Sequence, residues 1–410
     1  MFGVLSFCMI LHATVRASPT IEGCSIFPSN NIWNTPIDNL PVHSSSSTYI
    51  NTIGTDTGLH PDFGSGEWNG GPIGIPYTVV SQTQAKVGIT FDYADESDPG
   101  PYPIPPDALI EGGSDSQGDR HVLVLEKNNC LLYELFDAHH QPDNSWHAGS
   151  GAFFDLKSNN LRPDTWTSAD AAGLPILSGL VTYDEVMSGE ITHAIRFTAP
   201  QTQKAHVWSA RHDASSLTNP VYPPMGQRFR LKAEFDVSGF PLDIQTILTA
   251  FKKYGIILAD NGSAWYISGV PDERWDNDLL RLLSQVKGSD FEAVDVSSLM
   301  IDENSGEAKQ AFDNSISYVS KDDENCGGKS PCYSSIQSAI NAAESASRIL
   351  IAQGTYTEAI SLARPISLVI EGGWSNSFDN EEGYTVLNKI QVIQGSMTLR
   401  QLKIQPSLAD

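Results

Sequence analysis

Alternating apolar and polar residues run through most of the first 300 positions, and this pattern predicts β-strands. The clearest case is a hairpin, because Arg120–Glu126 and Cys130–Ala138 both alternate and Lys127–Asn129 supplies a turn between them. Further strands are expected at Tyr77–Val80, Lys86–Phe91 and Pro223–Phe235. The first 300 residues are therefore expected to be mostly β.

The segment Tyr183–Ser216 concentrates titratable side chains, and we interpret it as two strands joined by a polar turn. In the first strand His193 shares a face with apolar neighbours, and Arg196 takes the opposite face. In the second strand one face carries His206, Trp208, Ala210 and His212, and the other carries Val207, Ser209, Arg211 and Asp213. Three histidines and two arginines on paired strands are candidates for a site.

Helical periodicity begins only after residue 240. Asp243–Tyr254 places apolar residues on one stripe and is followed by Gly255, and Asp276–Val286 repeats this pattern before Gly288. Between these two helices, Ile256–Gly269 is predicted to be a hairpin with Asn261-Gly262 at its turn. The fold expected for residues 18–299 is a β-sandwich-like domain with two late helices, followed by a polar linker at 300–318.

The N-terminal 17 residues have the pattern of a secretory signal, since an apolar run is followed by small residues that suit cleavage after Ala17. The apolar run is too short to span a bilayer. Removing it takes Cys8 away and leaves an even number of cysteines, which in an exported chain indicates disulfides. Cys326 and Cys332 suit a local loop closure, which leaves Cys24 to pair with Cys130. We therefore expect a secreted, extracellular protein.

The chain is strongly acidic, with 25 basic against 49 acidic residues and a formal net charge of -24. Such a charge repels phosphate backbones and anionic lipid surfaces, so it argues against a nucleic-acid-binding protein. The chain has neither a Gly-x-Ser-x-Gly motif nor a phosphate-binding loop, which argues against a serine hydrolase of the nucleophile-elbow type and a nucleotide-binding enzyme.

Two kinds of catalysis fit the candidate residues. A glycoside hydrolase needs two carboxyl groups, and Glu134 is the candidate acid because it lies between apolar positions, with Asp213 among its possible partners. Pairing of Glu134 with Arg120 is the structural alternative. A polysaccharide lyase needs a base and a cation, for which His193 or His212 with Arg196 or Arg211 would serve.

Substrate-binding candidates are aromatic residues that can stack on sugar rings, together with one histidine: Trp146, Trp166, Trp208 and His121. The acidic loop at 92–107 has carboxylates at Asp92, Asp95, Glu96 and Asp98, which have calcium-like spacing, but a solvated loop is the preferred interpretation. The cysteines lack zinc-ligand spacing, which argues against metal binding through sulfur, and no cofactor is expected.

Two parts of the chain resemble known proteins. Tyr333–Glu358 and the strand-like runs after it resemble the start of right-handed parallel β-helix proteins of the pectin-lyase-like group, which implies an incomplete β-helix over 319–410 and no catalysis. The first domain resembles a group of uncharacterised secreted bacterial domains through the segments IFPSNNIWNTP, WNGGPIGIPY, YADESDPGPYPIP, GDRHVLVLE, LRPDTWTSADAAGLPILSGLVTYDEV, GEITHAIRFTAP and YGIILADNGSAWYISG. This second resemblance implies secretion and no particular activity.

The favoured hypothesis is a secreted carbohydrate-active protein that cleaves an extracellular polysaccharide, by hydrolysis or by elimination. The alternative is a non-catalytic module that binds polysaccharide or cell-surface glycan, with the β-helix as a spacer. A compact cluster of catalytic groups beside a pocket would favour the enzyme, whereas aromatic loops without such a cluster would favour the module.

Overall fold

The computed structural model describes residues 19–309, 316–343 and 347–405, so the expected signal peptide lies outside the described residues. The fold is mainly β. The chain divides into two compact units, the first up to Lys309 and the second from Gln310 onward. This division falls inside the segment predicted as a linker. Among the described residues, no helix combines the length and apolar character needed to cross a membrane.

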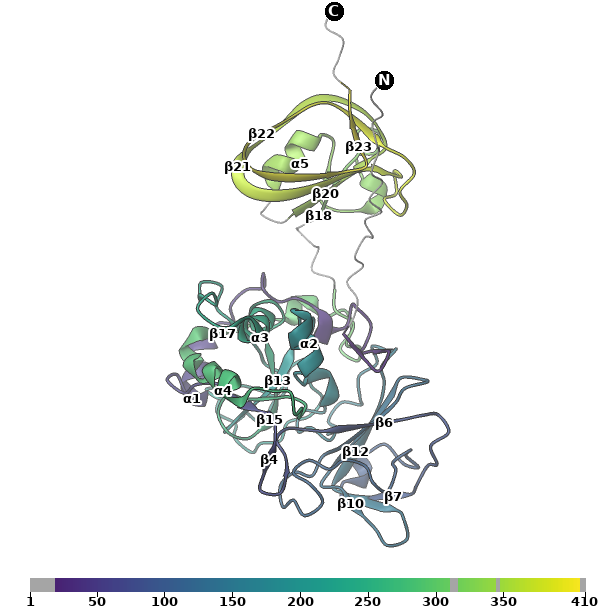
Figure 1. The fold of residues 1–410 in the computed structure, drawn as a ribbon, viewed down its shortest axis with the longest axis vertical. Helices are drawn as coiled ribbons and strands as arrows, with labels where there is room; N and C mark the ends of the chain where they lie inside the picture. Colours follow the sequence, from purple (N-terminus) through teal and green to yellow (C-terminus); the bar gives the residue numbers. More distant parts are fainter. Residues whose placement is uncertain (1–18, 310–315, 344–346, 406–410) are drawn as a thin grey trace, which may run out of the picture. The chain divides into compact units, whose positions relative to one another are not determined.

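A four-stranded sheet occupies one side of the first unit (Figure 1). Its order is β12 (Ser150–Asp155), β9 (Leu131–Phe136), β8 (Val122–Glu126) and β6 (Tyr77–Val80). The antiparallel pairing of β8 with β9 confirms the predicted hairpin. Both faces of this sheet are covered: Leu123, Leu125 and Leu132 join the main core, whereas Val122, Val124 and Tyr133 join a smaller core.

A six-stranded sheet forms the centre of the first unit. Its order is β17 (Phe291–Val294), β14 (Arg228–Leu231), β15 (Ile256–Asn261), β13 (Ile195–Ala199), β16 (Tyr266–Ser268) and β3 (His60–Asp62). The predicted hairpin at Ile256–Gly269 is wrong, because β13 lies between β15 and β16. The connection passes over the end of β13, where the N–H groups of Gly262 and Trp265 donate to the carbonyls of Ala199 and Thr198.

The interpretation of Tyr183–Ser216 as two strands is also largely wrong. The segment begins with helix α2 (Tyr183–Ser188) and continues as β13. After Ala199 it contains only a single β-bridge, between His206 and Met225. The helix begins at a capping box, since Thr182 Oγ1 accepts from the Glu185 N–H and donates to the Glu185 carboxylate. Gly189 ends it in the left-handed conformation, with φ of 85°.

The helices of the first unit partly match the prediction. Helix α3 (Leu242–Lys253) confirms the first expected helix, whereas the second shortens to α4 (Asn277–Leu280) followed by a 3-10 turn at Arg281–Gln285. Helix α1 (Ser46–Ile53) was not predicted, because its β-branched and serine-rich sequence has weak helix propensity. Its buried side chains Tyr49, Ile50 and Ile53 join the main core, and this packing offsets the weak propensity.

Short strands complete the first unit. β10 (His139–His140), β11 (Trp146–Ala148) and β7 (Ile89–Phe91) form a three-stranded sheet beside the smaller core. Two further pairs are β1 (Thr20–Ile21) with β2 (Cys24–Ser25), and β4 (Glu67–Trp68) with β5 (Gly71–Pro72).

The second unit contains one parallel sheet of six strands. Its order is β19 (Cys332–Tyr333), β18 (Ile316–Val319), β20 (Ser347–Ala352), β21 (Gly354–Trp374), β22 (Thr385–Arg400) and β23 (Leu402–Ile404). Register shifts interrupt the long pair β21 and β22, so these strands bend along their length. Helix α5 (Ile336–Ala342) packs Ile336, Ala339 and Ile340 into a core with Ile349 and Ile370.

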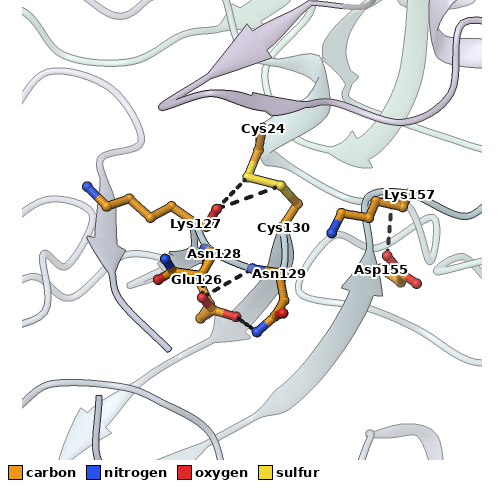
Figure 2. The surroundings of a disulfide bond; sticks show 8 residues. All are labelled: Cys24, Glu126, Lys127, Asn128, Asn129, Cys130, Asp155 and Lys157. Carbon is orange, nitrogen blue, oxygen red and sulfur yellow. Dashed lines mark hydrogen bonds between the residues drawn. A yellow bond between two sulfur atoms is a disulfide. The ribbon is translucent and has the colours of Figure 1, made fainter. Parts of the chain in front are cut away.

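Both expected cysteine pairs are disulfide-bonded, with Cα atoms 5.4 Å apart for Cys24–Cys130 and 5.7 Å apart for Cys326–Cys332. Figure 2 shows that the first bond joins the N-terminal segment to the turn between β8 and β9. The buried Glu126 carboxylate also stabilises this turn, because it accepts hydrogen bonds from the N–H groups of Asn128 and Asn129.

We predict that the double variant Cys24→Ser/Cys130→Ser lowers the free energy of unfolding of the first unit by about 2–4 kcal/mol, because this bond closes a long loop of the unfolded chain. Its sequence separation is 106 residues. Urea unfolding followed by tryptophan fluorescence measures the change. The matched control Cys326→Ser/Cys332→Ser removes a bond of the second unit, and a similar loss of first-unit stability in that control would contradict the prediction.

Candidate functional site

The loop Thr167–Gly173 connects the two large sheets of the first unit through its main chain. The carbonyl of Ala169 accepts from His121 Nε2 at 3.0 Å, and the carbonyl of Ala171 accepts from His212 Nδ1 at 2.8 Å. The N–H of Ala172 donates to the carbonyl of Ala259 in β15. Groups from His121, which immediately precedes β8, from β15 and from the segment after β13 therefore converge on seven residues.

Asp170 in this loop forms a buried ion pair with Arg196 of β13. The two carboxylate oxygens accept from Arg196 Nε at 2.9 Å and Nη2 at 2.7 Å, and Arg196 Nη1 donates to Ser268 Oγ at 2.5 Å. The Asp170 side chain has no exposed surface and that of Arg196 is 4% exposed. Burial opposes the charge on Arg196, but the adjacent Asp170 outweighs burial, so the pKa of Arg196 is raised.

Asp260 joins this pair because of a β-bulge. Arg196 lies opposite Ile257, whereas Thr198 lies opposite Asp260, so β15 contains one extra residue at Ala259. The extra residue turns Asp260 to the face that carries Arg196, and Asp260 Oδ2 lies 3.7 Å from Arg196 Nη2. Burial and the nearby charge of Asp170 raise the pKa of Asp260, although Arg196 opposes this shift.

Glu134, the predicted catalytic acid, lies beneath this network with no exposed surface. Its carboxyl group accepts from the N–H groups of Ile176 and Leu177 at 2.9–3.0 Å. Burial raises its pKa to about 7, although these hydrogen bonds oppose the shift. The alternative pairing with Arg120 is wrong, because the Arg120 guanidinium donates to the carbonyls of Ser114, Ser116 and Ala138.

A pocket of about 450 Å³ lies beside the segment that follows β13. It is lined by His206, Trp208 and Arg211 from the segment after β13, and by carboxylates that include Asp164, Asp295 and Glu303. His206 lies between two carboxylates, with Nε2 3.1 Å from Asp164 Oδ1 and Nδ1 3.4 Å from Asp213 Oδ1. Of the predicted site residues, Trp208 and Arg211 line this pocket, whereas Asp213 is outside its lining and contacts it only through His206.

The other predicted site residues are dispersed. Buried His193 lies 3.2 Å from Glu185 of α2, and burial opposes its protonation while Glu185 outweighs burial and raises its pKa. His212 Nε2 lies 3.6 Å from a Glu96 oxygen. Trp166 lies against the Arg162 guanidinium, 5.6 Å from ring centroid to Cζ. Trp146 is 1% exposed, so it is a core residue and offers no platform for a sugar.

The acidic loop holds its carboxylates apart. Asp98 pairs with Arg162, Asp92 lies 3.4 Å from His147, and Glu96 accepts from the Thr167 N–H. Because Asp92, Glu96 and Asp98 each contact a different partner, they do not form a common set of calcium ligands. Calcium binding by this loop therefore gains no support from the described geometry.

Sequence reasoning missed Asp164, Asp170 and Asp260 as members of the network. Asp170 lies in a run of small residues that ends at Gly173, whose φ is 69° and where an added Cβ would lie 2.6 Å from the Trp166 carbonyl oxygen. Small residues around one carboxylate are typical of tight packing, and this pattern is the one sequence feature that indicates a buried Asp170. The position of Asp260 depends on a bulge, for which the sequence offers no comparable signal.

We predict that Arg196→Met destabilises the first unit by about 3–5 kcal/mol, because it leaves the Asp170 carboxylate buried without its partner. Chemical denaturation measures the change. The double variant Arg196→Met/Asp170→Leu should lose less stability than the two single changes together. In the control Arg274→Ala, which removes an exposed arginine paired with Asp272, we expect no measurable change.

A second prediction concerns Glu134 and pH. Its folded-state pKa of about 7 lies above the 4.5 of an exposed glutamate, so the folded protein retains a proton that the unfolded chain has lost between these values. Stability should therefore fall by up to about 3 kcal/mol as the pH rises from about 4.5 to about 7, and should not change further through this group above that. Comparing unfolding of the wild type with Glu134→Gln at each pH isolates this effect, and parallel pH profiles would contradict it.

Comparison of the chain with models of protein families, with curated proteins and with solved structures finds no match.

Proposed function

We propose that the first unit binds a neutral extracellular polysaccharide in the pocket around His206 and hydrolyses it there. The observation that carries this proposal is a pocket of about 450 Å³ lined by Asp164 and His206, in which the His206 ring lies between Asp164 and Asp213, the latter outside the pocket lining. Concave sites of this size are typical of small-ligand or oligomer-segment binding. Hydrolysis of a glycosidic bond ordinarily uses two carboxyl groups held apart.

The charge of the pocket favours a neutral substrate. Asp164, Asp295 and Glu303 line it, so a uronate carboxylate would meet like charge. Arg211 is not free to bind a substrate carboxylate. Its guanidinium donates to the carbonyls of Arg162 and Glu303 and to the Asn304 amide oxygen.

Elimination by a lyase is disfavoured because the predicted arginines are already engaged. A lyase needs a cation that stabilises the enolate of the substrate carboxylate. Of the two predicted arginines, Arg211 is held as described above and Arg196 is held by Asp170. The two predicted bases are also separated from the pocket lining, since His193 contacts Glu185 and His212 contacts the Ala171 carbonyl. Hydrolysis is therefore the favoured reaction.

In this proposal Asp164, which lines the pocket, donates a proton to the leaving oxygen, and Asp213 acts on the attacking water through His206. Asp164, whose side chain is 62% exposed, is the one open to an incoming substrate, and Asp213 is 26% exposed. His206 contacts both and can pass a proton between them. Trp208, held by its Nε1 donation to the Ser305 carbonyl, presents its ring to the pocket for stacking on a sugar.

The test is a reducing-end assay of the full chain on neutral polysaccharides and on uronate polymers, with ultraviolet absorbance recorded for unsaturated products. We expect reducing ends from a neutral polymer, and a loss of about 10²–10⁴-fold in Asp164→Asn and Asp213→Asn. Asp155→Asn, which changes a carboxylate at the end of β12, is the matched control and should retain activity.

Unsaturated products from a uronate polymer would overturn hydrolysis in favour of elimination. Retained binding of a glycan without any cleavage would leave the non-catalytic glycan-binding module in its place. Activity that is unchanged in both aspartate variants would remove the pocket from the proposal.

We also propose that the second unit is the start of a right-handed parallel β-helix and that the two large sheets of the first unit are a sandwich-like pair. The uniformly parallel pairing of β18, β20, β21, β22 and β23 supports the first point. The shared main core of β8, β9 and the six-stranded sheet supports the second. Two disulfides support secretion, since such bonds persist in oxidising compartments.

A further inference from the structure

A second group of ligand-type side chains lies in the segment that precedes β8. Glu111, Asp119 and His121 each offer one ligand atom, and these three atoms lie within 4.8 Å of one another. We infer that they bind a divalent transition-metal ion of the zinc type. The inference uses none of the residues of the His206 pocket, and it does not depend on the proposed hydrolysis.

The three residues belong to a loop that is closed by its own main chain. The Glu111 N–H donates to the His121 carbonyl at 3.0 Å, which joins the two ends of the loop. The Arg120 guanidinium fills the loop by donating to the carbonyls of Ser114 and Ser116. The ligand side chains are therefore held near one another before an ion arrives, which lowers the cost of binding.

The orientation of His121 suits metal binding. Its side chain is 3% exposed, and Nε2 lies 3.0 Å from the Ala169 carbonyl. A carbonyl only accepts hydrogen bonds, so Nε2 carries a hydrogen and Nδ1 is the nitrogen that faces the carboxylates. A second-shell carbonyl of this kind is the usual partner of a metal-bound histidine.

The donor set favours zinc over calcium. Calcium prefers six to eight oxygen ligands, whereas zinc accepts one imidazole nitrogen and two carboxylate oxygens and leaves a fourth position for water. Asp119 is exposed and the Glu111 side chain is 24% exposed, so water can reach that position. His121 Nδ1 and Glu111 Oε2 are 2.6 Å apart and would separate to about 3.3 Å, the edge of a tetrahedron with bonds of about 2 Å.

The surroundings favour a positive ligand. Two further carboxyl groups, Asp62 and Asp260, interact electrostatically with Asp119; burial is the main cause that raises their pKa, and the Asp119 charge adds to it. Both Arg196 and Arg120 are already engaged, since Arg196 donates to both oxygens of Asp170 and Arg120 donates to main-chain carbonyls. A divalent ion would offset this excess of carboxylates.

The test is calorimetric titration of the chelator-treated full chain with ZnCl2, together with visible spectra after addition of CoCl2. We expect one ion per chain and the d–d absorption of four-coordinate cobalt. Asp119→Asn, a change at an exposed side chain that should leave the fold intact, is expected to weaken zinc binding at least 10-fold, as is His121→Gln. If His121→Gln does not fold, Glu111→Gln takes its place.

His139→Gln is the matched control, because His139 is an exposed histidine that lies 2.8 Å from the Asp137 carboxylate. It should bind zinc as the wild type does. The inference is overturned if zinc does not bind, if affinity is unchanged in Asp119→Asn, if the control alone loses binding, or if calcium binds in preference to zinc. Retained zinc binding in Asp164→Asn, whatever its activity, would separate this site from the hydrolytic pocket.

Discussion

The buried pair of Arg196 and Asp170 is the interaction on which the arrangement of the first unit depends. Two charges with almost no exposed surface are tolerated in the core because each is paired with the other and because Ser268 Oγ accepts a further hydrogen bond from Arg196. The pair fixes the loop Thr167–Gly173 against the six-stranded sheet. Since the same loop accepts hydrogen bonds from His121 and His212, the position of both histidines follows from it.

Two chemically different groups of side chains lie near this loop. In the first group, Asp164, His206 and Asp213 are partly exposed, and Asp164 and His206 line the pocket where we propose that a substrate binds. In the second group, Glu111, Asp119 and His121 form a compact set in which His121 is buried. The loop links them structurally, while the proposed hydrolysis and the proposed metal binding use separate residues.

Charge selects what the protein can bind. The chain has a formal net charge of -24. Near the candidate sites, the arginines do little to neutralise it for a ligand, because Arg211 is bonded to carbonyls and Arg196 to a carboxylate. Arginines that are committed in this way stabilise the fold and leave the surrounding carboxylates to determine the local potential. This local charge is the reason for proposing a neutral polysaccharide and a metal cation as ligands.

The sequence by itself determined the mainly β character, the hairpin of β8 and β9, helix α3 and both cysteine pairs, because each depends on local alternation, periodicity or a parity of cysteines. Helix α2 was not predicted, because the alternation around His193 favoured a strand, although Thr182 and Gly189 are residue types typical of the two ends of a helix. Only the tertiary structure decided that β13 separates β15 from β16 and that a bulge turns Asp260 toward Arg196. These features depend on pairing between distant segments, and local patterns carry no information about which strand a neighbour will be.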